Sequence, residues 1–175
     1  MIKNILTIPK NDEKLRQRSD EVITFDKSVG QILKDLTDTI DAQTDPVGLG
    51  LSAPQIGIQK RIFVARVRNK IKGFVNPIIT KFSQKEVTIM EGCFSVPDIY
   101  GHVIRPAEID LKSQDAHGKT SATHYKGLPS RIIQHEIDHL DGKLFIDHVH
   151  DQNGKVFKFE RDKDGKEQFV EVPLA

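Results

Sequence analysis

The chain has 175 residues, a length that suits one domain with a sizeable core. Its 26 basic side chains are balanced by 25 acidic ones, so its charge gives no reason to expect a nucleic acid or a membrane surface as a partner. No segment is apolar over the length of a membrane span or a signal peptide, and one cysteine cannot form an internal disulfide, so we expect a cytoplasmic protein.

The N-terminal part of the chain predicts one helix. Apolar side chains recur at helical spacing between residues 28 and 42. Asp45-Pro46 and the glycines that follow end this stretch, because they favour a turn. We therefore expect a helical region before the first strand.

The glycine-rich segment 48–57, Gly-Leu-Gly-Leu-Ser-Ala-Pro-Gln-Ile-Gly, allows two interpretations. Its match to a dinucleotide-binding fingerprint is superficial, because a helix precedes it and no acidic residue ends a strand about 20 residues later. One interpretation is a tight turn that leads into a strand from residue 61. In the other, Gly50 lets a substrate backbone approach closely, and Gln55 offers a neutral amide donor for an oxyanion.

The middle of the chain predicts short antiparallel strands with turn residues between them. We expect three pairs, formed by 61–67 with 72–76, 78–82 with 86–90, and 108–114 with 120–126.

The pattern then becomes helical from residue 128 to 140, with Pro129 in the first turn and Asp141-Gly142 at the end. The tail alternates from 156 to 172 around a turn at 162–165, which predicts a hairpin. We therefore expect an α+β fold: antiparallel β-sheets surround a central metal-binding α-helix, with an N-terminal helical region and a C-terminal β extension. Residues 1–175 would form a single catalytic domain in which 151–175 is a β-hairpin tail.

The helix at 128–140 carries a candidate metal site. His135 and His139 are four residues apart and therefore lie on one helical face, with Glu136 beside them. Cys93 is the only cysteine, and two imidazoles with one thiolate would leave a fourth tetrahedral position open for water. The alternatives are two histidines that are exposed or hydrogen-bonded to the core, and a cysteine that is only a small buried apolar residue.

Three separated motifs together resemble the signature of the peptide deformylase family. They are Gly-x-Gly-x-x-Ala-x-Gln at 48–55, Glu-Gly-Cys-x-Ser at 91–95 and Gln-His-Glu-x-Asp-His at 134–139. The resemblance extends from Ile8-Pro9 to about residue 150. It implies a hydrolase that removes the formyl group from the N-terminal methionine of nascent polypeptides with one divalent metal ion. Fe(II) is the ion implied in cells, with Zn(II), Ni(II) or Co(II) in purified protein.

The resemblance also implies a role for each matching residue. The metal ligands would be Cys93, His135 and His139, and Glu136 would be the general base and later the acid. The formyl oxygen would bind Gln55 and the backbone N–H of Phe94, while the peptide backbone would pair with Gly50. The methionine pocket would be lined by Ile89, Leu128 and Ile132, with the aliphatic part of Glu91 nearby.

Two charged side chains near the methionine pocket leave alternatives open. Glu91 would form an ion pair with Arg105 that braces the strand of Cys93, or the two would be independent surface charges. Arg131 replaces an apolar residue that is frequent in the family, so we expect it either to face solvent or to place its guanidinium at the pocket rim. A preference for an acidic residue after the methionine would follow from the rim position.

The C-terminal segment affects the expected partners, and His148 and His150 affect the alternative functions. Some bacterial family members end in a basic helix that contacts the ribosome, and this chain ends in an alternating segment instead, so that contact is not carried over. A zinc endopeptidase is the main alternative, with a third ligand from His148 or His150, although we expect both in a solvated loop. Further alternatives are an inactive metal module, which the presence of Glu136 and Gln55 disfavours, and deformylation outside protein synthesis.

Overall fold

The structure is a computed structural model that describes residues 1–161, 163 and 166–173. Its elements follow in the order α1 (Asp12–Leu15), α2 (Lys27–Asp41), β1 (Gly50–Ser52), the 3-10 helix η1 (Ala53–Ile56), β2 (Ile62–Val67), β3 (Lys70–Phe82), β4 (Glu86–Cys93), β5 (Val96–Pro106), β6 (Glu108–Gln114), β7 (Thr120–Lys126), α3 (Leu128–Leu140), α4 (Phe145–Asp151), β8 (Val156–Arg161) and β9 (Glu167–Val172).

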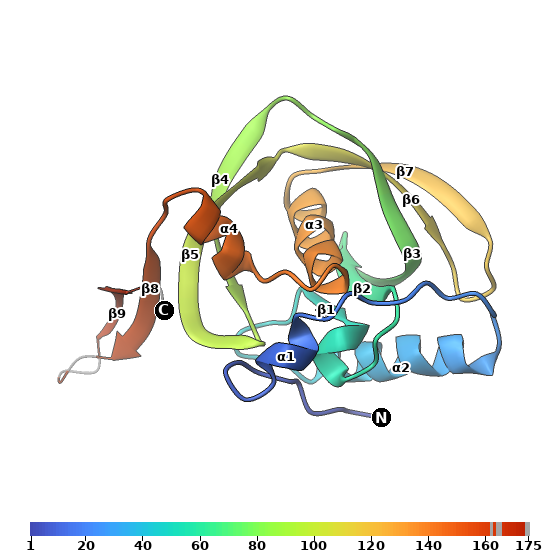
Figure 1. The fold of residues 1–175 in the computed structure, drawn as a ribbon, viewed down its shortest axis with the longest axis horizontal. Coiled ribbons are helices and arrows are strands. Elements are labelled where there is room, and N and C mark those ends of the chain that lie inside the picture. Colours follow the sequence, from blue (N-terminus) through green and yellow to red (C-terminus); the bar gives the residue numbers. More distant parts are fainter. Residues whose placement is uncertain (162, 164–165, 174–175) are drawn as a thin grey trace.

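Two antiparallel sheets lie on either side of α3 (Figure 1). One sheet has the strand order β1-β2-β3-β6-β7, and the other has the order β4-β5-β8-β9. In Figure 1, α3 occupies the centre, α2 lies along the first sheet, and β8 and β9 project beyond β5. The predicted α+β fold with a central helix is therefore confirmed.

Helix α2 forms where the sequence predicts it, because it has a cap and an apolar stripe. The side chain of Asp26 accepts a hydrogen bond of 2.8 Å from the amide of Ser28 and so satisfies one free donor of the first turn. Val29, Leu36 and Ile40 are buried in one cluster with side chains of β1 and β2. Burial of each such side chain is worth about 1.5–3 kcal/mol, which fixes α2 against the first sheet.

Helix α3 has the predicted bounds and ends at a position that only glycine suits. Pro129 lies in its first turn, and Ile133 and Leu140 are fully buried in a cluster with strands β2 and β6. Gly142 follows the helix with φ 73°, and a Cβ there would overlap the backbone of Arg16. These contacts fix both the rotation and the end of the helix that carries the histidines.

The predicted strand pairs are partly correct. Pairing of β2 with β3 and of β6 with β7 is confirmed. The expected pair of 78–82 with 86–90 is wrong, because β3 runs through 70–82 and pairs with β2 and β6, whereas β4 pairs with β5 in the other sheet. The pairing of β3 shifts in register between Val75 and Ile78. The sequence prediction placed a strand end at this irregularity and so divided β3 into two strands.

Strand β5 and helices α1 and α4 were not predicted. The buried side of β5 carries Gly101 and Arg105 as well as Val103. The strand therefore lacks the alternation of apolar and polar residues from which a strand is predicted. Helices α1 and α4 span only 4 and 7 residues, too few for a clear helical period. Strand β5 connects the metal-binding part of β4 to the C-terminal hairpin.

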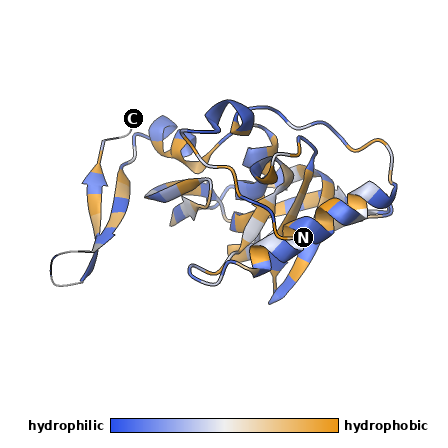
Figure 2. Ribbon diagram, turned by 90° about the horizontal axis from the view of Figure 1, so that it is seen from below, coloured by the Kyte–Doolittle hydropathy of each residue, from blue (hydrophilic) through white to orange (hydrophobic). Residues whose placement is uncertain are grey.

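The C-terminal hairpin is confirmed as the pair β8 and β9, while its predicted turn residues 162, 164 and 165 lie outside the described residues. Both strands carry a mixture of hydrophobic and hydrophilic residues (Figure 2). None of the helices within residues 1–161, 163 and 166–173 combines the length and apolar character needed to cross a membrane.

Candidate active site

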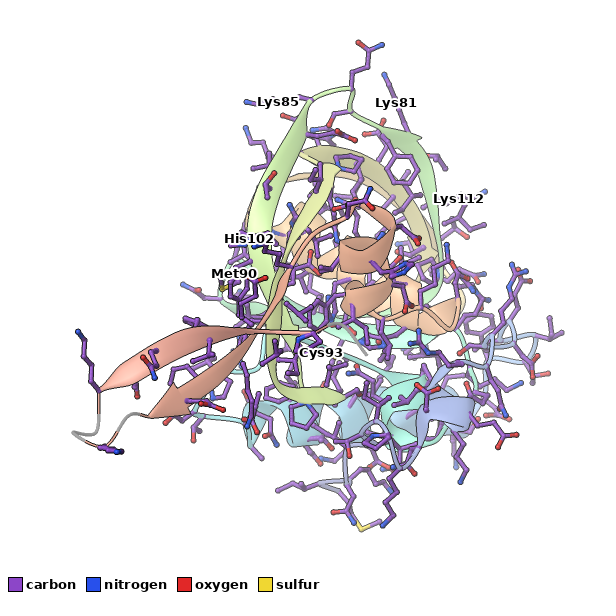
Figure 3. All side chains as sticks on the ribbon, turned by 60° about the vertical axis from the view of Figure 1, so that its left-hand side comes forward. Lys81, Lys85, Met90, Cys93, His102 and Lys112 are labelled. Atoms are coloured by element: carbon purple, nitrogen blue, oxygen red, sulfur yellow. The ribbon has the colours of Figure 1, made fainter. Side chains whose placement is uncertain are left out.

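The three predicted metal ligands lie together where the two sheets approach α3. Cys93 ends β4, and His135 and His139 are one turn apart on α3. The Sγ atom of Cys93 is 3.2 Å from Nε2 of His139, and one donor atom from each of the three residues lies within 4.8 Å of the others. In Figure 3, Cys93 lies near the centre of the molecule, below Met90 of the same strand and His102 of β5.

The electrostatics of the donor group favour a thiolate at Cys93, which is the form that binds metal, and a protonated ring at His135. Burial opposes ionisation of Cys93, but the nearby rings of His139 and His135 outweigh it and hold the pKa of the thiol well below its usual value. Burial alone would lower the pKa of His135, and its hydrogen bonds with Cys93 and Glu91 reverse that effect and raise it. A metal ion that binds the thiolate would therefore displace the proton of His135, because an imidazole ligates a metal only in its neutral form.

Glu91 fixes the orientation of His135. Its Oε2 atom lies 2.9 Å from Nδ1 of His135, which leaves Nε2 of that ring to face a metal. Arg105 donates to both carboxylate oxygens of Glu91, with distances of 2.7 and 3.0 Å. The predicted ion pair is therefore confirmed, and the alternative of two surface charges is wrong because both residues are buried.

Arg131 lies in a place that the sequence did not predict. Its side chain neither faces solvent nor ends at the pocket rim, because the residue is 6% exposed and its guanidinium is bound on several sides. Nη1 donates to Oε1 of Glu91 at 2.8 Å and to the carbonyl of Val103 at 3.0 Å, and Nη2 donates to the carbonyl of Val87. Both proposed orientations are corrected, and the expected preference for an acidic second residue loses its basis.

Glu136 is a buried carboxylate beside the metal-donor group. Its residue is 3% exposed, and burial is the main cause that raises the pKa of its carboxyl group above the usual value. Ser52 of β1 donates a hydrogen bond to Oε2 of Glu136. Gly50, also on β1, leaves room for the carboxylate, since a Cβ at that position would overlap Oε1 of Glu136.

Gln55 is held with its amide nitrogen toward Cys93. Its Oε1 atom accepts a hydrogen bond of 2.8 Å from the backbone of Ser52. Its Nε2 atom is 3.1 Å from Oγ of Ser95 and 3.4 Å from Sγ of Cys93. Neither serine was given a role from the sequence, although Ser52-x-x-Gln55 is a capping-box pattern that predicts this backbone contact.

A cavity of about 400 Å³ connects the donor group with the surface. Its size is in the range of small-molecule and peptide side-chain sites. Ile132 is 6% exposed inside it, whereas Ile89 and Leu128 are 37% and 52% exposed and leave apolar surface open. The lining includes the predicted site residues Gly50, Gln55, Ile89, Glu91, Cys93, Phe94, Leu128, Arg131, Ile132, His135 and Glu136. Among the lining residues that were not predicted are Pro97 and Tyr100.

The histidines of the rival zinc-endopeptidase reading lie elsewhere. His148 is on α4, and not in the solvated loop we expected, with Nε2 2.8 Å from Oδ2 of Asp138. His150 is exposed on the same helix. Neither belongs to the donor group that the described residues form around Cys93.

The fold and site together are typical of a metal-dependent hydrolase, with sulphur and imidazole groups that could hold an ion beside one buried carboxylate. Comparison with known proteins identifies the family. The model of the family described as Polypeptide deformylase matches residues 2–155. The chain is 38% identical over 146 residues to the peptide deformylase of Picosynechococcus sp., covering 81% of this chain and 76% of that protein. It is 39% identical over 153 residues to that of Rhizobium meliloti, covering 85% of each.

Solved structures agree. The crystal structure of peptide deformylase from Thermotoga maritima has a TM-score of 0.78 at 32% identity, covering 85% of this chain and 97% of that one. A peptide deformylase from Legionella pneumophila gives 0.77 at 38% identity, covering 85% and 86%. The chain belongs to the peptide deformylase family.

Proposed function

We propose that this enzyme, as a peptide deformylase, hydrolyses the N-formyl group of formyl-methionyl peptides to formate with a metal held by Cys93, His135 and His139. The observation that carries the residue assignment is the convergence of one thiol and two imidazoles within 4.8 Å beside a buried carboxylate. Thiolate and imidazole suit both Fe(II) and Zn(II), so the donors fit a divalent transition metal. Fe(II) is the ion we propose in cells, and Zn(II), Ni(II) or Co(II) in purified protein.

Cys93, His135 and His139 would hold a divalent ion, which would supply Lewis acidity and make a water molecule nucleophilic near neutral pH. Glu136 then acts as general base, taking a proton from the water that attacks the formyl carbon. Its raised pKa suits this role, because a base with a pKa closer to the working pH can also return the proton. Glu136 delivers that proton to the departing amine.

The negative charge that develops on the formyl oxygen needs fixed donors. Gln55 is pre-oriented for this role by its contact with Ser52, and the backbone N–H of Phe94 is the second proposed donor. Loss of one such donor typically costs about 3–4 kcal/mol of barrier. The peptide backbone of the substrate would pass Gly50, where the absence of a side chain leaves space.

The methionine side chain would lie against Ile89, Leu128 and Ile132. These side chains line the same cavity as the donor group, and two of them leave apolar surface exposed. Glu91 and Arg131 form the buried floor behind them, since both line the cavity and are bound to each other. Their role is to hold His135 and the strands in place, and no direct contact with substrate is required.

Two measurements on one preparation test this proposal. Protein purified without oxygen is analysed for metal content, and formate release from formyl-Met-Ala-Ser is assayed, with casein digestion as the test of the endopeptidase alternative. We expect about one metal ion per chain, formate release and no casein cleavage, in keeping with one open catalytic site. Casein cleavage without formate release would reject the proposed function.

The remaining proposals concern cellular context. We propose that the substrates are nascent chains, that the enzyme acts in the cytoplasm, and that residues 1–175 form one catalytic domain. Ribosome contact is not part of the proposal, because the resemblance associates that contact with a basic C-terminal helix, and this chain has the strands β8 and β9 after the matched residues.

A further inference from the structure

The C-terminal hairpin lies outside the residues that the family model matches. That match ends at residue 155, and β8 begins at Val156. The hairpin nevertheless continues the sheet of the active site, because β8 pairs with Ile99, Tyr100 and Gly101 of β5. Figures 1 and 3 show it projecting away from the body of the molecule next to β5. Its function is therefore a separate question from the family assignment.

One face of this extended sheet carries an aromatic strip, which we define as Tyr100, Phe157, Phe159 and Phe169. Strand register places these four side chains on the same face. The ring centroids of Tyr100 and Phe169 are 5.3 Å apart, and those of Phe159 and Phe169 are 5.5 Å apart. Phe169 remains 48% exposed, so the strip offers aromatic surface to a partner.

The strip begins inside the active-site cavity. Tyr100 lines that cavity together with Ile89, Leu128, Cys93 and His135. Its ring packs on Gly92, where a Cβ would be 2.6 Å from Cε1 of Tyr100, and Gly92 directly precedes Cys93. The ring of Tyr100 thus lies over the strand that carries Cys93 and connects the cavity with Phe169.

We propose that the aromatic strip binds the part of a formylated peptide that follows the methionine, with a preference for apolar and aromatic side chains. This inference rests on the proposed function, which places the methionine against Ile89 and Leu128. The rest of the peptide must then leave the same cavity, and Tyr100 is a cavity wall that leads outward onto the hairpin. Rigid aromatic rings bind apolar side chains at a low cost in conformational entropy.

The test compares peptide lengths. Formate release is measured for formyl-Met-Ala, for a longer formyl-Met peptide that ends in two phenylalanines, and for one that ends in two aspartates. Wild-type enzyme should show the highest kcat/KM on the peptide with phenylalanines. In Phe169→Ala, the advantage of that peptide over formyl-Met-Ala should fall by about two- to tenfold, the effect of one lost aromatic contact, through KM and not kcat.

Val170→Ala is the matched control. Val170 is also exposed on β9, but it points to the opposite face of the sheet, so its removal should leave the length dependence unchanged. Phe169→Leu, which keeps apolar bulk, should recover part of the advantage. An equal length dependence in wild type and Phe169→Ala overturns the inference, as does an equal loss in Phe169→Ala and Val170→Ala.

Binding separates this inference from the proposed function. Fluorescence anisotropy of a labelled formyl-Met peptide with terminal phenylalanines measures affinity without turnover. Weaker binding to Phe169→Ala than to Val170→Ala supports the strip even where no formate is released. Equal affinities for both variants would reject the strip and leave deformylation intact.

Discussion

Glu136 is the residue on which the chemistry depends most directly. It is buried, bonded to Ser52, and adjacent in sequence to a proposed metal ligand without being a member of the donor group. Glu136→Ala should therefore retain its metal and lose nearly all turnover, since a general base contributes about 10²–10⁴-fold. Metal analysis and formate release on one preparation check this.

Glu136→Gln is the control for that prediction, because it keeps the volume and removes the charge. We expect it to be as inactive as Glu136→Ala. Activity of either variant within tenfold of wild type would remove Glu136 from the role of base.

Arg131 makes a prediction about stability. Arg131→Leu would leave Glu91 with one guanidinium fewer and would deprive the carbonyls of Val87 and Val103 of a donor. Breaking a buried ion pair costs about 3–5 kcal/mol. The free energy of unfolding, measured with urea, should fall by that amount.

The control is Arg18→Leu, because Arg18 is 81% exposed and lies 3.9 Å from Asp141. A surface pair contributes about 0–1 kcal/mol. Similar losses in the two variants would show that the contacts of Arg131 do not stabilise the fold.

At the scale of the element, the β6–β7 hairpin contains a titratable pair. His124 lies opposite Asp110, with Nδ1 2.7 Å from its Oδ1, and Nε2 is 3.1 Å from Glu108. The hydrogen bond to Asp110 is the main cause that raises the pKa of His124 above its model-peptide value of 6.5. Asp110→Asn should lower the pKa again, as measured by NMR titration of the ring protons.

The raised pKa of His124 determines how its contribution to the stability of the folded protein changes with pH. Protonated His124 stabilises the hairpin fully below the pKa of the unfolded chain, and this contribution is lost as pH rises through the higher pKa of the folded protein. Asp115→Asn is the control, because Asp115 binds backbone amides of the same hairpin loop. An unchanged His124 pKa in Asp110→Asn would contradict the assignment.

Elements were predictable where one segment carried its own signal. Helix α3 and the β6–β7 hairpin have clear periods and turn residues, so their bounds match the prediction. The turn between β3 and β4 looks equally local, yet each strand pairs with a different partner. Strand β5 places glycine and arginine at inward positions, and its partners, not its own pattern, make it a strand.

At the scale of the whole molecule, the donor group was predictable from motif spacing, whereas its surroundings were not. Cys93 and His139 are 46 residues apart, and the three motifs identify them only jointly. The contact of Arg131 with Glu91 spans 40 residues and has no local signal in the sequence. Arg131 was therefore expected in solvent or at the pocket rim, and not as a buried partner of Glu91. Ser52 and Ser95 were missed because short hydroxyl side chains occur in many environments.

Metal removal tests how the site contributes to the whole fold. The donors come from β4 of one sheet and from α3, which packs on the other sheet, so a bound ion links both halves. Metal at about 100 times its dissociation constant would stabilise the folded state by about 2.7 kcal/mol. Chelation should then lower the melting temperature of wild type by about 5–10 °C. Cys93→Ser should lose metal on dialysis and show a much smaller shift. An equal shift in both proteins would exclude Cys93 as a ligand.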